Sequence, residues 1–109
     1  MTRFVVDAYA WIEYLAGSQA GEKVKLIITN EHEQIYTSSV TIAEVISKIK
    51  RQDRDYETAY KVITTLSKPM IVDEEASKSV GLLHAQIRKK ITNFGLADAY
   101  VLHLAKSLK

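Results

Sequence analysis

The feature that most constrains this fold is the alternation of short strand-like runs with long helical stretches. Three runs rich in β-branched and aromatic residues, at 4–6, 34–37 and 70–72, predict strands. Two stretches with apolar residues at helical spacing follow each run, so the predicted order is β-α-α-β-α-α-β-α-α. Strands separated by helices pair in parallel, with helices over both faces of the sheet. We therefore predict a three-layer α/β/α domain with a parallel central sheet.

Polar residues mark the ends of several predicted helices. Gly17 should end the first helix, and Ser18 should cap a second one that extends to about residue 31. Asp73 should cap a helix that extends to about residue 90. The last helix is expected from about Leu96, with an apolar stripe facing inward. That stripe consists of Val101, Leu102, Ala105 and Leu108.

Composition narrows the class of protein. A chain of 109 residues is long enough for one small domain. The absence of cysteine excludes disulfides and thiolate metal sites, and it fits a reducing cytoplasm. No apolar run approaches the roughly 20 residues of a membrane span, and the run before Asp7 is too short for a signal peptide. The four glycines form no phosphate-binding loop, which leaves little support for a nucleotide-binding domain. We therefore expect a cytoplasmic protein that does not contact membranes.

The C-terminal part of the sequence departs from the usual alternation. In an alternating α/β protein, a helix normally crosses over to a further parallel strand. Here the chain ends at Lys109, directly after the last predicted helix. Two interpretations remain open. Either the chain is truncated, or another element or partner covers this face of the sheet.

Three carboxylates are expected at the carboxyl edge of the predicted sheet. Asp7 directly follows the first predicted strand. Glu44 lies in the first turn of the helix that follows the second strand, and Asp98 lies at the start of the apolar stripe of the last helix. Ligands of open α/β sheets bind outside this edge. A charge that faces inward is costly unless it is compensated, and a divalent cation would compensate it. Carboxylate oxygens suit Mg²⁺, whereas zinc is not expected without cysteine or paired histidines.

Each acid also has a purely structural interpretation. Asp7 can cap the helix that follows it. Thr41 and Glu44 match the spacing of a capping box. Asp98 is favoured in a first helical turn by the helix dipole. Spacing alone leaves both the caps and the metal site open.

Three segments resemble the three motifs of PIN domains, above all those of VapC toxins. The segments are Phe4–Leu15 around Asp7, Thr37–Val45 around Glu44 and Gly95–Tyr100 around Asp98. They occur in the order of the family and span nearly the whole chain. We therefore interpret residues 1–109 as a single PIN-like domain.

The resemblance implies a PIN-like α/β/α fold and a metal-dependent endoribonuclease that hydrolyses RNA phosphodiester bonds. Asp7, Glu44 and Asp98 would be the catalytic residues and the ligands of Mg²⁺ or Mn²⁺, with a water attacking the phosphate in line. It further implies a homodimer and a VapB-type antitoxin with its C-terminal segment in the active-site groove. Single-stranded or looped RNA is the expected substrate, because unstacked strands reach a shallow acidic cleft most readily. The alternative is a catalytically degenerate PIN-like module that binds RNA or antitoxin without cleavage.

The sequence departs from the family at two places. Many members have Ser or Thr after the first Asp, whereas this chain has Ala8, so a nearby hydroxyl would come from Tyr9, Ser39 or Thr41. The family usually adds a further strand with another acid after the last helix. This sequence shows no such C-terminal strand or acid before Lys109, so both a truncated domain and a natural length of 109 residues stay open.

One basic residue is a separate candidate for substrate or partner contact. Arg88 opens the densest basic run, Arg88-Lys89-Lys90. A guanidinium group binds phosphate or carboxylate through two hydrogen bonds. Arg88 could therefore contact an RNA phosphate or a carboxylate of the antitoxin, although the run also fits a solvated helix face.

Overall fold

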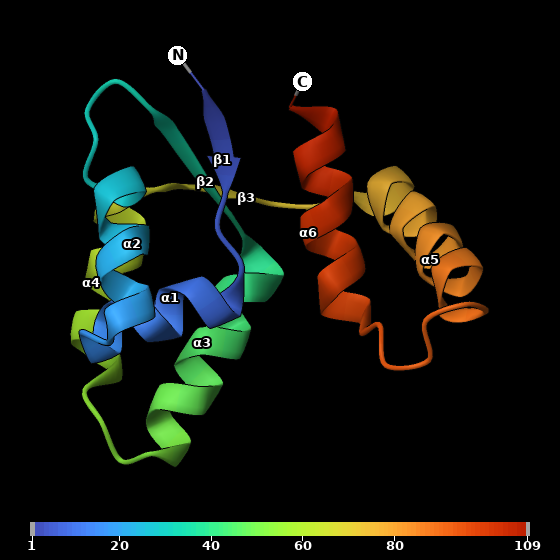
Figure 1. The fold of residues 1–109 in the computed structure, drawn as a ribbon. Coiled ribbons are helices and arrows are strands. Elements are labelled where there is room, and N and C mark those ends of the chain that lie inside the picture. The colour runs from blue at the N-terminus through green and yellow to red at the C-terminus, as the bar shows by residue number, and fades with distance from the viewer. Residues whose placement is uncertain (1, 109) are drawn as a thin grey trace.

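The structure, a computed structural model, describes residues 2–108, and its elements follow the predicted order (Figure 1). The strands are β1 (Arg3–Val5), β2 (Gln34–Ser38) and β3 (Lys68–Met70). The helices are α1 (Ala8–Ala16), α2 (Gln19–Ile28), α3 (Ser39–Arg51), α4 (Tyr56–Leu66), α5 (Glu74–Arg88) and α6 (Leu96–Ser107). Within these residues no helix is both long and apolar enough to cross a bilayer.

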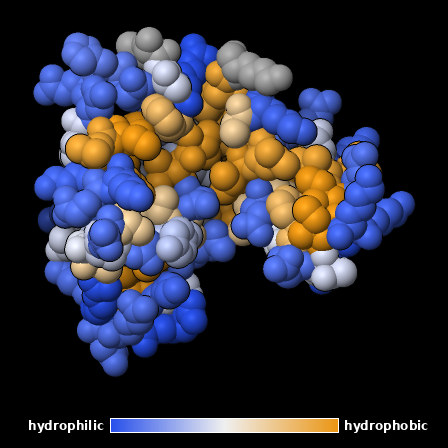
Figure 2. All heavy atoms as spheres, in the orientation of Figure 1, coloured by the Kyte–Doolittle hydropathy of each residue, from blue (hydrophilic) through white to orange (hydrophobic). Residues whose placement is uncertain are grey.

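The three strands form one parallel sheet with the order β1-β2-β3. Phe4 pairs with Ile35, and Thr37 pairs with Pro69. Helices α1 to α4 lie on one side of the sheet, and α5 and α6 lie on the other (Figure 1). In the same view, apolar residues gather in the middle over the strands and α6, and polar residues cover the outer faces (Figure 2). The predicted three-layer α/β/α architecture with a parallel sheet is confirmed.

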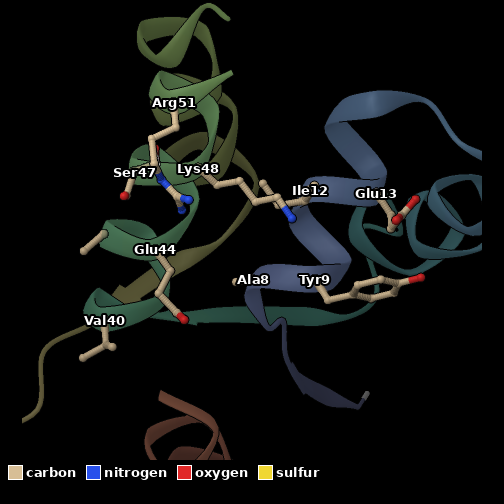
Figure 3. A pocket seen from close by; sticks show the side chains of 10 residues that line it. Ala8, Tyr9, Ile12, Glu13, Val40, Glu44, Ser47, Lys48 and Arg51 are labelled. Carbon is tan, nitrogen blue, oxygen red and sulfur yellow. Dashed lines mark hydrogen bonds between the residues drawn. The ribbon is translucent and has the colours of Figure 1, made fainter. Parts of the chain in front are cut away.

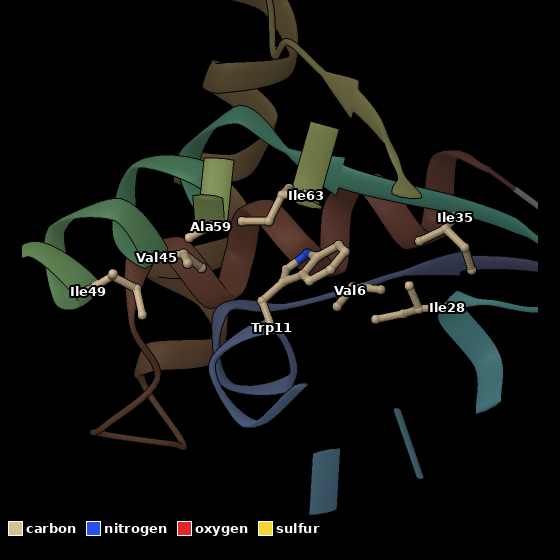
Figure 4. Packing of buried hydrophobic residues seen from close by; sticks show 8 residues of the cluster. All are labelled: Val6, Trp11, Ile28, Ile35, Val45, Ile49, Ala59 and Ile63. Carbon is tan, nitrogen blue, oxygen red and sulfur yellow. The ribbon is translucent and has the colours of Figure 1, made fainter. Parts of the chain in front are cut away.

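The main core lies between the sheet and α1 to α4, with Trp11 at its centre (Figure 4). Its buried members are Val6, Trp11, Ile28, Ile35, Val45, Ile49, Ala59 and Ile63. Trp11 is 0% exposed, and its indole N–H donates to the Thr37 hydroxyl oxygen over 3.1 Å. The Thr37 hydroxyl donates in turn to Ser67 over 2.7 Å, so these buried polar groups are paired.

Side-chain caps begin most of the helices, as the polar residues predict. Ser18 and Asp73 cap α2 and α5 by accepting backbone N–H hydrogen bonds, which confirms both predicted caps. Gly17 ends α1 with a left-handed φ of 67°, which favours glycine. Gly21 lies so close to the α1 backbone that a Cβ there would overlap the Glu13 carbonyl oxygen, so glycine permits this packing of α2 on α1.

Some predicted boundaries and faces are wrong. β3 lies two residues earlier than predicted, with Pro69 at its middle, and an edge strand tolerates the missing N–H. α2 ends at Ile28 rather than near residue 31. In α6 the buried residues are Ala99 and Leu104, whereas Ala105, a member of the predicted stripe, is exposed. The reason is that α6 contacts the sheet, α3 and α5, so it is covered from several sides.

Candidate metal centre

The three predicted acids lie where β1 and β2 end and α6 begins (Figure 1). Asp7 is the N-cap of α1, which directly follows β1. α6 runs antiparallel to β1, because the Arg3 guanidinium at the start of β1 donates to the Leu108 carbonyl oxygen over 2.9 Å. The first turn of α6, with Asp98, is therefore at the carboxyl edge of the sheet, where ligands of such folds bind.

The charges of Asp98 and Asp7 both act on Glu44. The pKa of Glu44 is raised, first by partial burial and then by the negative charges of Asp98 and Asp7. No positively charged group contributes to this shift. Asp7 and Asp98 are thus each close enough to Glu44 to act on its charge.

Two of the acids also cap helices. Asp7 accepts the Ala10 N–H through Oδ1 over 2.8 Å, and Asp98 accepts the Gly95 N–H through Oδ2 over 2.8 Å. A Cβ at residue 95 would lie 3.2 Å from Asp98 Oδ2, so Gly95 leaves room for this carboxylate. A carboxylate has two oxygens, so a cap made through one does not exclude a cation at the other.

The spacing between Thr41 and Glu44 suggested a capping box with Glu44 in the first turn of its helix. Both predictions are wrong. α3 begins at Ser39, and its N-cap is Ser38, whose hydroxyl oxygen accepts the Val40 N–H over 3.2 Å. Glu44 is therefore in the second turn and takes no part in starting the helix. Its carboxylate points from α3 toward α6 (Figure 3).

Asp98 does not head an inward stripe as predicted. Its side chain is exposed, and its neighbour Ala99 is the buried residue. An exposed carboxylate costs less free energy than a buried one. The expectation that a cation compensates a buried charge at Asp98 therefore does not apply. The reason that remains is the repulsion among three carboxylates that share one edge.

Joint ligation of one ion by the three acids is not seen in this arrangement and stays a prediction. Within residues 2–108, no three or more His, Cys, Asp or Glu side chains are placed so that they could hold a metal ion together. Two of the acids are held at their caps by the N–H groups of Ala10 and Gly95. The donors nevertheless suit Mg²⁺ or Mn²⁺, because such ions prefer oxygen, and Mg²⁺ keeps several waters that can bridge to more distant carboxylates.

A groove of about 630 Å³ lies between α1 and α3, and Glu44 is the one of the three acids that lines it (Figure 3). Its lining residues are Ala8, Tyr9, Ile12, Glu13, Val40, Ala43, Glu44, Ser47, Lys48 and Arg51. The carboxylate of Glu44 lies at one end, and the basic side chains of Lys48 and Arg51 lie toward the other. Sequence reasoning missed these two basic residues, although their spacing of four and seven residues from Glu44 places all three on one helix face.

The other residues singled out from the sequence are scattered. Tyr9 lines the groove and is 67% exposed, with its phenol directed away from Glu44 (Figure 3). Thr41 is buried, and its hydroxyl is the one buried side-chain polar atom within residues 2–108 that lacks a hydrogen-bond partner. Ser39 is the first residue of α3. Arg88 is exposed at the end of α5, which lies on the far side of α6 from α3 (Figure 1).

Comparison with known proteins gives a family match and a structural match. The family model described as PIN domain matches residues 4–109. The crystal structure of VapC20 from Mycobacterium tuberculosis, described as a sarcin-ricin loop cleaving toxin, superimposes with a TM-score of 0.75. The two sequences are 14% identical over 99% of this chain and 83% of that one, so this likeness concerns the fold. No curated protein sequence matches the chain.

Proposed function

The chain belongs to the PIN-domain family, and from this membership we propose that it is a metal-dependent endoribonuclease with Asp7, Glu44 and Asp98 as its catalytic carboxylates. The observation that supports the proposal is that Asp7 and Glu44 follow β1 and β2, that Asp98 lies in the first turn of α6, and that Asp98 and Asp7 both raise the pKa of Glu44. The description of the structurally similar VapC20 as a loop-cleaving toxin supports RNA as the substrate class.

The proposed ligands of Mg²⁺ or Mn²⁺ are these three carboxylates, two of which are already fixed in place by their caps. When bound, such an ion polarises a phosphoryl oxygen and lowers the pKa of a water that can attack the phosphate. A cation would relieve the repulsion that raises the pKa of Glu44, so cation binding and ionisation of Glu44 would support each other.

The proposed partners follow from the family rather than from any contact in the structure. We propose single-stranded or looped RNA as substrate, because unstacked strands reach an open groove most readily. A VapB-type antitoxin that occupies the groove, a homodimer and a cytoplasmic location complete the proposal.

The test is RNA cleavage in Mn²⁺ by the wild type and by Asp7→Asn, Asp98→Asn and Glu44→Gln. Asparagine keeps an acceptor oxygen for each cap, so these variants remove charge while the helix starts are preserved. We expect each variant to lose about 100-fold or more of the cleavage rate. Asp73→Asn is the matched control, because Asp73 caps α5 away from the three acids. Equal rates for the wild type and all three variants would reject the site.

A second candidate is a degenerate PIN module that binds RNA or antitoxin without cleavage. Two observations favour it, which are the capping roles of Asp7 and Asp98 and the lack of a ready three-residue metal site within residues 2–108. This candidate predicts RNA binding without turnover and a melting temperature that does not respond to Mg²⁺ or Mn²⁺.

A further inference from the structure

We propose that Lys48 and Arg51 form a phosphate-binding site that holds the RNA backbone beside the cleaved bond. This inference rests on the proposed function, since it assigns the substrate a path through the groove between α1 and α3. The path would begin at the carboxylate of Glu44 and continue along α3 to the two basic side chains.

The first argument is the polarity of the groove along α3. Glu44, Lys48 and Arg51 occupy positions i, i+4 and i+7, so they share one face of the helix and line one groove. A rise of 1.5 Å per residue places the Cα atoms of Lys48 and Arg51 about 6 Å and about 10 Å from Glu44 along the axis. These separations are comparable with one to two nucleotide steps of an extended strand.

The second argument is the placement of the two basic groups. Arg51 donates through Nε to the Ser47 carbonyl oxygen over 3.3 Å, which lays the guanidinium along the helix and leaves its Nη groups to bind an anion. Lys48 extends across the groove toward Ile12 on α1 and away from Glu44 (Figure 3). An i, i+4 ion pair with Glu44 would be the usual structural role of Lys48, but a side chain that runs toward α1 does not form one.

The third argument is the chemistry of the remaining lining. Ala8, Ile12, Val40 and Ala43 are small or aliphatic and offer an apolar surface to sugars and bases. The other acid of the groove, Glu13, accepts a hydrogen bond from the Ser18 hydroxyl, which directs its carboxylate to α2. A phosphodiester backbone carries negative charge at regular intervals, so it matches two cations about one helical turn apart. An acidic peptide would carry charge at no fixed spacing.

The experiment measures binding of a fluorescein-labelled 12-nucleotide oligouridine by anisotropy, in EDTA and across a series of KCl concentrations. Wild type, Lys48→Gln, Arg51→Gln and the double variant are compared. We expect the slope of log affinity against log salt to shrink by about 0.7 for each single variant and by about 1.4 for the double variant. Lys50→Gln is the matched control, because Lys50 has the same charge on the same helix but lies over the Tyr56 ring at 5.6 Å, outside the groove. The control should keep the wild-type slope.

Three results would overturn the proposal. These are a wild type that does not bind the oligouridine, a double variant with the wild-type slope, and a Lys50→Gln slope that shrinks as much as that of Lys48→Gln. Failure of this proposal can be distinguished from failure of the nuclease proposal. Binding in EDTA needs no cleavage, and the carboxylate variants keep both basic residues. In Mn²⁺, a positioning role also requires that the double variant raises KM while kcat stays near the wild-type value.

Discussion

Replacement of Asp98 by asparagine tests whether Asp98 belongs to the proposed metal site or only caps a helix. Asp73, which caps another helix, provides the comparison. Both aspartates are exposed, and each accepts a backbone N–H over 2.8 Å at a helix start. Asparagine keeps the acceptor in both cases. The difference is that only Asp98 contributes to the raised pKa of Glu44. The settings of the two caps also differ, since Asp73 is the N-cap of α5 and precedes Glu74 and Glu75, whereas Asp98 is the third residue of α6 and accepts the N–H of Gly95. The quantity compared is the repulsion that Asp98 adds to Glu44.

The expected sizes follow from two opposing effects. Loss of a negative charge at a helix N-terminus costs about 0.3–1 kcal/mol in either variant. For two like charges about 8 Å apart in an effective dielectric of about 40 to 80, relief of repulsion contributes about 0.5–1 kcal/mol. Without metal, Asp73→Asn should therefore lower the free energy of unfolding, whereas Asp98→Asn should leave it nearly unchanged. At about 4 °C per kcal/mol, the melting temperatures of the two variants should differ by about 2–4 °C.

The assay is thermal unfolding followed by circular dichroism at low salt, first in EDTA and then in a MgCl₂ series. At ten times the dissociation constant, a bound ion adds about 1.4 kcal/mol to the stability of the wild type, or about 6 °C. Asp73→Asn should show this increase in full, and Asp98→Asn should show less of it. If both variants lose the same stability in EDTA, the proposed repulsion between Asp98 and Glu44 is refuted. An equal metal-induced increase in Asp98→Asn and wild type would show that Asp98 does not bind the ion.

Three further predictions concern the site and its supporting fold. Because the pKa of Glu44 is raised, the folded state holds this proton more tightly than the unfolded chain, so stability in EDTA should fall as pH rises above about 4.5. Glu44→Gln should flatten that fall in urea unfolding series, and an unchanged pH profile would contradict the shift. Gly21→Ala should lose more than about 2 kcal/mol, since its Cβ would overlap an α1 carbonyl oxygen, whereas Gly81→Ala meets open space on α5 and should gain about 0.5–1 kcal/mol. Trp11→Phe removes the buried N–H donor to the Thr37 hydroxyl and should cost about 1–3 kcal/mol in urea unfolding, and a neutral effect would argue against that hydrogen bond.

Local patterns in the sequence were sufficient to predict the order of the strands and helices. A β-branched run before Asp7 predicts a strand, and apolar spacing around Trp11 and Val45 predicts the inward faces of α1 and α3. The caps at Ser18 and Asp73 follow in the same way, because capping depends on a hydroxyl or carboxylate three residues from the N–H that it binds. These properties are local, since each depends on neighbours within about one helical turn.

The shape of the site depended on contacts between distant segments. The start of α3 at Ser39 moved Glu44 out of a capping position, and the antiparallel course of α6 brought Asp98 to the edge that Asp7 occupies. In α6 the contacts with neighbouring elements bury Ala99 and not Asp98, and Lys48 became a groove residue because α1 packs across α3. Periodicity within one segment reports which residues share a face. It does not report which other segment that face meets, since that is set by packing summed over the whole chain.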